Sequence, residues 1–320
     1  MKIGFIGTGF MASKHSEVAI SLGHEISFAL GKRNSRTFDS FLNAHQGCVE
    51  FFDLDNFLAQ EECDAIIVTT PPFVTQTMLP KLIESKKFVL VEKPGFLTSD
   101  LPIKIVSNNR IFFAYNRRFY SSVSHLKRFM QLQSTHLSLT VSEKVAPSID
   151  EKCEILINNS VHYFDLVNYL LPGSNFGNFR ISSHGEHIDA DILRVSEYLG
   201  YISVKFGIPM NSQISATALG KFMLLKPIES CMVANSMMID EPSDENPIRV
   251  YNPVFQKLSL DSNDILFKPG IYLQDETFFK LVLGQISNND NEHLANLNDA
   301  KLALQTAEQF ANTLKHNLSL

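Results

Sequence analysis

The 320-residue chain is 44% hydrophobic and 19% charged. This composition permits two buried cores and excludes extended disorder. It has 28 basic and 34 acidic residues, which gives a net charge of −6. A polybasic surface for nucleic acid or anionic lipid is therefore not expected. No apolar run reaches the roughly 20 residues of a membrane span. We therefore predict a cytoplasmic protein that acts on a small molecule, without nucleic-acid or membrane partners.

The first 114 residues alternate short apolar runs with segments of helical periodicity, the pattern of a parallel sheet covered by helices. The predicted strands are Lys2–Ile6, Glu25–Leu30, Val49–Phe52, Ala65–Thr69, Phe88–Val91 and Ile111–Ala114. The predicted helices between them begin near Phe10, Ser35, Leu54, Phe73 and Thr98.

Beyond Tyr115 the pattern changes to mixed helices and alternating strands. The expected helices are Ser121–Gln131, Asn158–Leu171, Asp275–Ile286 and Asn296–Lys315; the expected strands are His136–Lys144, Arg194–Leu199, Tyr201–Phe206, Gln213–Ala218 and Lys221–Leu225. Short polar turns favour a mostly antiparallel sheet here. We predict an α/β protein: a doubly wound Rossmann domain over 1–117, and an α+β substrate domain with an open sheet over 118–320, on which the final helices pack.

The first strand runs into Gly7-Thr8-Gly9-Phe10-Met11-Ala12, a GxGxx(G/A) turn between a strand and a helix. Gly7 permits a tight turn, Gly9 lets a pyrophosphate approach the backbone, and Ala12 lets the helix pack closely. The helix N-terminus adds unpaired N–H groups. We expect residues 7–11 to bind a dinucleotide; a turn that only packs a βα unit is the alternative.

The second strand is followed by basic residues instead of the acidic residue that would bind the ribose 2′-hydroxyl of NAD. Lys32, Arg33 and Arg36 stand where a 2′-phosphate would lie. The pattern favours NADP over NAD, although a solvated charged turn would look the same. The four cysteines, Cys48, Cys63, Cys153 and Cys231, lack metal-ligand spacing, and no metal is expected.

Four segments together give the chain its resemblance to a known family. They are Thr69-Thr70-Pro71-Pro72, Glu92-Lys93-Pro94, Ala114-Tyr115-Asn116-Arg117-Arg118-Phe119 and Val161-His162-Tyr163-Phe164-Asp165. In this order, and with the Gly-rich turn, the chain resembles the glucose-fructose oxidoreductase and inositol dehydrogenase (Gfo/Idh/MocA) family. The first half is the closer match.

The resemblance implies that Lys93 lies beside the nicotinamide and contacts the reacting oxygen. It also implies that Thr70, Pro71 and Glu92 line the cofactor site. The residues themselves agree, because Lys93 follows a parallel strand at the edge where ligands of such sheets bind. An ammonium there can polarise a carbonyl or stabilise a developing alkoxide.

The resemblance assigns proton exchange to His162, whose side-chain type suits a general acid or base. On a regular helix Asn158, His162, Asp165 and Tyr169 would form one polar stripe. The family pattern commonly has Asp and Gly where this chain has Asn158 and Ser160. Since Asn cannot exchange a proton, we expect Asn158 to hydrogen-bond the substrate. Thr75 stands where a His is common.

Asn116 and Arg117 follow the last Rossmann strand, and by resemblance they line the substrate pocket; a structural role for Arg117 is the alternative. The resemblance implies an NAD(P)-dependent dehydrogenase or reductase acting on a secondary alcohol or ketone of a sugar, cyclitol or nucleotide sugar, assembled as a homodimer or homotetramer. Two rival hypotheses are a dinucleotide-binding regulatory protein without turnover, which Asn158 would favour, and a reductase of a non-sugar compound.

Overall fold

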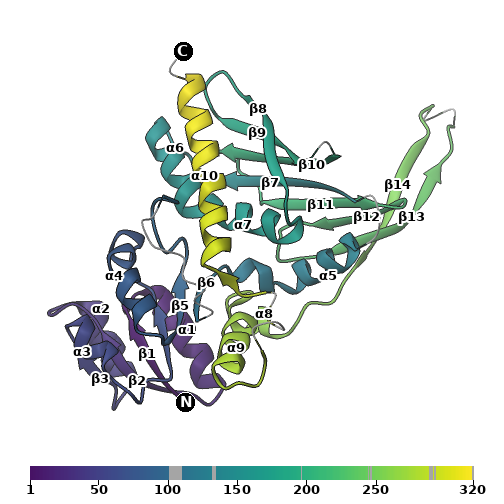
Figure 1. The fold of residues 1–320 in the computed structure, drawn as a ribbon. Helices are drawn as coiled ribbons and strands as arrows, with labels where there is room; N and C mark the ends of the chain where they lie inside the picture. The colour runs from purple at the N-terminus through teal and green to yellow at the C-terminus, as the bar shows by residue number, and fades with distance from the viewer. Residues whose placement is uncertain are drawn as a thin grey trace. The chain divides into compact units, whose positions relative to one another are not determined.

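The computed structural model describes residues 1–100, 110–131, 135–195, 197–243, 245, 247–287, 291 and 293–318 (Figure 1). The chain forms two compact units, the first from Met1–Phe119, Leu156–Leu166 and Ser262–Gln309, the second from Tyr120–Ile155, Val167–Asp261 and Phe310–Leu320. The chain therefore returns to the first unit twice, whereas the sequence predicts one boundary after residue 117. None of the helices described is long and apolar enough to cross a membrane.

The first unit contains a doubly wound sheet in the order β15-β6-β5-β4-β1-β2-β3. Its strands are β1 (Lys2–Ile6), β2 (Glu25–Leu30), β3 (Val49–Phe51), β4 (Ala65–Val68), β5 (Phe88–Glu92), β6 (Ile111–Ala114) and β15 (Ala295–Asn296). β1 to β6 pair in parallel, and β15 adds an antiparallel edge. The order reverses between β1 and β4, the switch point where ligands of such sheets bind.

Helices of the first unit follow the predicted βα pattern. They are α1 (Phe10–Ser21), α2 (Arg36–Ala44), α3 (Leu54–Leu58), α4 (Pro72–Glu84), the short turns η1 (Asn116–Phe119) and η2 (Leu156–Ser160), α8 (Asn263–Leu266) and α9 (Ile271–Val282). The first four helices, α1 to α4, begin at the predicted residue or at its neighbour, because the apolar period specifies a helix locally. The helix α9 begins at Ile271, before its predicted start at Asp275. The helix expected near Thr98 falls mostly on 101–109, outside the described residues.

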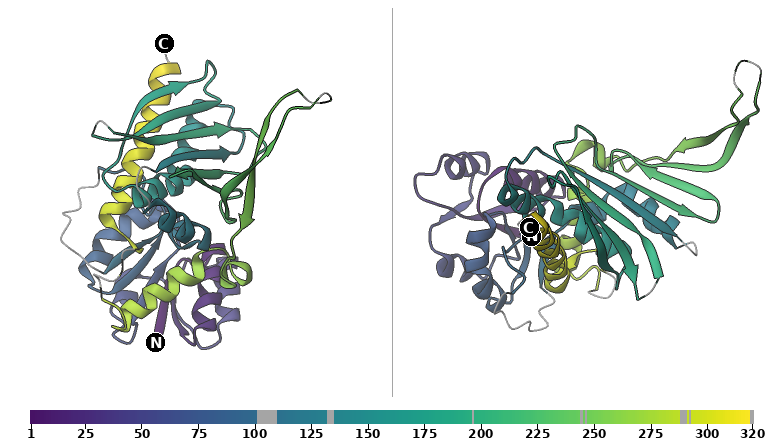
Figure 2. Two further views of the ribbon diagram at one scale, coloured as in Figure 1. Left: turned by 90° about the vertical axis from the view of Figure 1, so that its right-hand side faces the viewer. Right: turned by 90° about the horizontal axis from the view of Figure 1, so that it is seen from above.

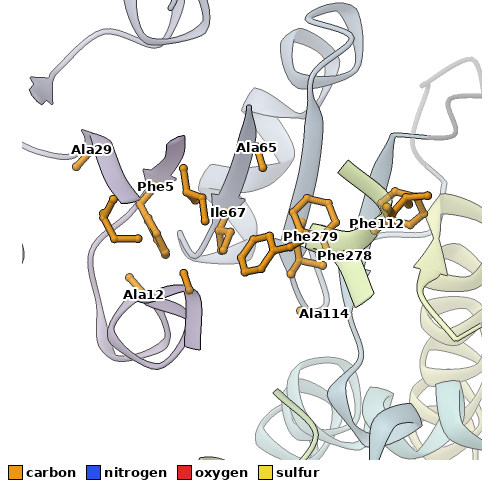
Figure 3. Close-up of a cluster of buried hydrophobic side chains, with 14 of the residues drawn as sticks. Phe5, Ala12, Ala29, Ala65, Ile67, Phe112, Ala114, Phe278 and Phe279 are labelled. Carbon is orange, nitrogen blue, oxygen red and sulfur yellow. The ribbon is translucent and has the colours of Figure 1, made fainter. Parts of the chain in front are cut away.

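The core of the first unit joins the sheet to α1 and α9 (Figure 3). Ala12 is fully buried under the sheet, as its small size predicts. Phe278 of α9 packs against Phe112 of β6 with ring centroids 6.2 Å apart. The sequence places α9 with the C-terminal domain, whereas in the structure its phenylalanines are buried against the Rossmann sheet.

The second unit contains an eight-stranded sheet in the order β14-β13-β12-β11-β7-β10-β9-β8. Its strands are β7 (His136–Glu143), β8 (Asn175–Ile181), β9 (His187–Arg194), β10 (Glu197–Phe206), β11 (Gln213–Ala218), β12 (Lys221–Leu225), β13 (Met232–Asp240) and β14 (Val250–Lys257). Among the strands described in this sheet, only β7 and β10 pair in parallel, so the predicted mostly antiparallel sheet is confirmed. Figure 2 shows the β13–β14 hairpin, in light green, extending beyond the other strands of this sheet.

The remaining helices are α5 (Ser121–Met130), α6 (Ile149–Ile155), α7 (Val161–Leu170) and α10 (Leu297–Leu318). Two expectations are wrong here. The strand predicted over 194–199 is interrupted, since β9 ends at Arg194 and Val195 takes a φ of +56° in the turn to β10. The helix predicted to begin at Asn158 instead follows α6 and the π-helical turn η2, so it is not a regular helix from that residue.

Candidate active site

The Gly-rich turn has the geometry that its sequence predicts. Gly7 has a φ of +84°, and a Cβ at this position would lie 2.8 Å from the Thr70 side chain, so only glycine fits. Its N–H donates to the carbonyl of Leu30 at 2.9 Å, and its carbonyl accepts from the Thr69 hydroxyl at 2.9 Å. These bonds fix the turn at the switch point between β1 and β4.

Gly9 is the N-cap of α1 and meets the requirements of a phosphate site. No side chain caps the helix there, so the N–H groups of its first turn remain available for an anion. A Cβ on Gly9 would meet no atom within 4 Å. The space above the helix end is therefore open to a ligand, and a dinucleotide pyrophosphate fits it.

A cavity of about 960 Å³ opens beside this turn. Nine residues that the sequence assigned to the cofactor line it: Gly7, Thr8, Gly9, Met11, Lys32, Thr70, Pro71, Glu92 and Lys93. Phe10 and Arg33 are not among its lining residues. Phe10 is 69% exposed, and the Arg33 guanidinium stacks on the Phe52 ring at 3.9 Å. Ser35 and Thr37 also line the cavity, and the sequence reasoning missed both.

Thr75 supports the wall formed by Thr70 and Pro71. Its buried hydroxyl lies 2.8 Å from the Thr70 hydroxyl and contacts the Thr70 and Pro71 carbonyls at 3.1 and 3.3 Å. The absence of a histidine at position 75 therefore leaves a compact turn that small hydroxyl groups hold in place.

Lys93 extends from the end of β5 to the turn η2. Its Nζ donates a hydrogen bond to the main-chain carbonyl of Asn158 at 2.8 Å. His162, one turn later on α7, is 9% exposed, and its ring meets the Tyr115 ring edge-on with centroids 5.9 Å apart. The structure therefore gathers Lys93, Asn158 and His162 within the first unit.

Arg117 and Lys268 complete the surroundings of His162. The Arg117 guanidinium lies 3.6 Å above the ring of Tyr163, the neighbour of His162. Burial lowers the pKa of His162 well below its usual value, and the positive charges of Lys93, Arg117 and Lys268 lower it further. The imidazole is therefore neutral at pH 7. The sequence reasoning did not identify Lys268.

Three buried polar atoms at this site have no hydrogen-bond partner in the described structure: Nδ1 of His162, the hydroxyl of Tyr115 and one terminal nitrogen of Arg117. A buried polar atom without a partner costs about 1–3 kcal/mol. Polar groups of a bound ligand would relieve this cost. These three atoms are therefore candidate contacts for a ligand that can hydrogen-bond.

Asp165 does not belong to an exposed polar stripe. It is fully buried, and the guanidinium of Arg118 binds its two oxygens at 2.9 and 2.5 Å. Burial raises the pKa of Asp165 to about 6 against the opposing effect of Arg118. This pair anchors α7 to η1, and it thereby fixes the helix that carries His162.

A second buried charge cluster connects α1, β5 and α9. Nδ1 of His15 lies 2.7 Å from Asp275, and Nε2 lies 3.1 Å from Glu92. Burial opposes the charged imidazole, but the two carboxylates raise the pKa of His15 to about 10. The sequence reasoning missed this cluster, since no local pattern relates His15 to a residue 260 positions away.

The comparisons with known proteins agree with this arrangement. Residues 1–101 match the GFO_IDH_MocA model, described as an oxidoreductase family with an NAD-binding Rossmann fold. This N-terminal third of the chain is therefore similar to the family that the motifs indicate.

Three further proteins resemble the chain. An uncharacterized oxidoreductase of Bacillus subtilis, YrbE, is 24% identical over 52% of this chain and 53% of its own length, so the match spans about half of that relative. UDP-N-acetylglucosamine 3-dehydrogenase from Acidithiobacillus ferrooxidans has a TM-score of 0.74 at 13% identity, covering 99% of both chains. The WlbA dehydrogenase from Chromobacterium violaceum, solved with NADH and UDP-GlcNAcA, has a TM-score of 0.72 at 14% identity, covering 99% of this chain and 94% of its own. These two structures share the fold.

Proposed function

We propose that the protein is an NAD(P)-dependent oxidoreductase that interconverts a secondary alcohol and a ketone on a sugar, cyclitol or nucleotide sugar. The observation that carries the proposal is the position of Lys93. It lines the dinucleotide-sized cavity and is hydrogen-bonded to the turn that precedes His162. A cofactor site and a candidate proton-transfer group thus adjoin the same ammonium.

The chain supplies binding and proton chemistry. A nicotinamide ring bound in the cavity would supply the hydride donor or acceptor. The Lys93 ammonium polarises the substrate oxygen and stabilises the charge that develops on it. His162 exchanges the proton of that oxygen. Because its imidazole is neutral at pH 7, His162 has a lone pair that can accept the alcohol proton when the substrate is oxidised.

The cofactor that we propose is NADP. Lys32, Ser35 and Thr37, which follow β2 in the chain, line the cavity, and the Ser35 and Thr37 hydroxyls are 3.0 Å apart. A cation and two hydroxyl groups suit a phosphate, and a carboxylate for the 2′-hydroxyl of NAD does not line this cavity beside them. Fluorescence titration with NADPH and NADH tests the choice. We expect the protein to bind NADPH more tightly than NADH, and Lys32→Asp should reverse this preference. Tighter binding of NADH by the unaltered protein would contradict the proposal of NADP.

Replacing Lys93 tests the catalytic proposal. With a panel of sugars, cyclitols and nucleotide sugars, Lys93→Met should reduce turnover at least about 100-fold, the scale of losing an electrostatic stabiliser. Cofactor affinity should change only a few-fold. Lys81→Met is the matched control, since Lys81 is exposed and paired with Asp55 on another surface.

Two results would contradict the proposal. One is the absence of cofactor-dependent turnover across the panel together with normal cofactor binding, which would favour a regulatory dinucleotide-binding protein. The other is equal turnover by Lys93→Met and Lys81→Met.

A further inference from the structure

Three cations act on His162 in the first unit. Lys93, Arg117 and Lys268 each lower the pKa of its imidazole by their charge. They come from three separate segments of the chain, the end of β5, η1 and the residues before α9. The substrate chemistry proposed above requires one ammonium, so Arg117 and Lys268 remain to be explained.

Packing holds both residues near the site. The Asn116 side chain donates to the carbonyl of Pro269 at 2.9 Å, which joins the start of η1 to the segment that carries Lys268. The Lys268 ammonium lies 3.4 Å from the Met11 sulfur, on the first turn of α1. Arg117 is held by its stacking on Tyr163.

Two carboxylates of the first unit, Glu92 and Asp165, already have partners. Glu92 is bound to His15, and Asp165 is bound in bidentate fashion to Arg118. Within the described part of the chain, neither Arg117 nor Lys268 forms an ion pair. One terminal nitrogen of Arg117 is buried and has no partner there. A guanidinium that has no ion pair and one nitrogen without a partner can bind an oxyanion through both its charge and its planar N–H groups.

We propose that the substrate is an anion, and that Arg117, assisted by Lys268, binds its carboxylate or phosphate group. The inference rests on the proposed function and narrows its substrate class to sugar acids, sugar phosphates or nucleotide sugars, in preference to neutral sugars and cyclitols. Arg117 is then a substrate-binding residue that selects by charge.

An anion at this position also affects the proton-transfer group. Its negative charge would offset the three cations and raise the pKa of His162 toward neutrality. A bound substrate would therefore make His162 a stronger base than it is in the free protein. Binding and proton transfer would be coupled through charge.

The cofactor is itself an anion, so the test is done on protein saturated with NADPH. Inorganic phosphate and acetate represent the two anion chemistries, and glycerol is the neutral probe. The pKa of His162 is followed by NMR, with His162→Asn assigning the signal. We expect phosphate, acetate or both to raise this pKa, and glycerol to leave it unchanged.

Arg117→Gln should raise the anion concentration that gives half of the shift in the His162 pKa at least about tenfold, the scale of one charged hydrogen bond. Lys280→Gln is the control, because Lys280 is exposed and paired with Glu276 on α9. The response to phosphate compared with that to acetate distinguishes a phosphorylated substrate from a carboxylate.

The inference is overturned if neither anion moves the His162 pKa, or if Arg117→Gln responds like Lys280→Gln. A failure of NADPH and NADH to bind would contradict the proposed function separately. The same titration without cofactor would then still decide whether Arg117 binds an anion.

Discussion

Lys93 holds Asn158 by its main chain, since the ammonium donates to the Asn158 carbonyl at 2.8 Å. The carbonyl is present whatever side chain stands at position 158. The replacement of the family's usual aspartate by asparagine therefore leaves this connection between β5 and the turn before α7 intact. The side chain of Asn158, which is partly exposed, is available for a substrate.

Asn158→Ala should consequently leave cofactor affinity within about twofold of the original. We expect KM for the substrate to rise about three- to tenfold, the value of one neutral hydrogen bond, with kcat nearly unchanged. Steady-state kinetics and cofactor titration measure both. A loss of kcat as large as that of Lys93→Met would show that the side chain, and not the carbonyl, is essential.

The pH dependence of substrate oxidation should reflect the depressed pKa of His162. As the pH rises through that pKa the imidazole loses its proton and becomes a base, so kcat/KM should increase and then level off below pH 6.5. Lys268→Gln removes one cation, which raises the pKa and shifts this limb to higher pH. The pH profile of kcat/KM, with Lys280→Gln as control, provides the measurement; a limb that stays in place or moves to lower pH would refute the electrostatic argument.

His15 should make the stability of the protein depend on pH. Its folded pKa of about 10 lies above the unfolded value of about 6.5. Its contribution is therefore complete below pH 6.5 and is lost as the pH rises through 10. In urea unfolding between pH 6.5 and 10, the stability difference between the original protein and His15→Gln should shrink. The exposed His184→Gln serves as control, and a difference that is constant over this range contradicts the prediction.

Breaking the buried pair of Arg118 and Asp165 should be costly. Arg118→Met leaves the Asp165 carboxylate buried without its partner, which destabilises by about 3–5 kcal/mol. Arg180→Met, in an exposed pair with Asp191, should cost only about 0–1 kcal/mol. Urea unfolding compares the two. Adding Asp165→Leu to Arg118→Met should restore part of the stability, and equal losses in the two single variants would show that burial of the pair is unimportant.

Local patterns predicted most of the Rossmann half. β1, β2 and β6 have the predicted bounds, because a short apolar run between turn residues specifies a buried parallel strand. The Gly7 turn was equally predictable, since only glycine tolerates its positive φ beside Thr70. The placement of Gly7, Gly9 and Lys93 along one cavity follows from the shared edge of parallel strands.

The second half was less predictable. Val195 is β-branched and takes a left-handed conformation that such residues rarely adopt. The apolar pattern around it therefore predicted one continuous strand where the structure has a turn between β9 and β10. The π-helical turn before Val161 disrupted the regular spacing on which the polar stripe depended.

The amino-acid sequence by itself determined a Rossmann unit with a dinucleotide turn, because strand periodicity and glycine conformation are local properties. Lys93 and His162 were singled out by the resemblance of their motifs to a known family. The tertiary structure decided the electrostatics. It placed Arg117 and Lys268 where their charges lower the pKa of His162. It paired Asp165 with Arg118 and enclosed His15 between Glu92 and Asp275. Such pairings join residues far apart in the chain, and their effect depends on burial, which only the folded arrangement establishes.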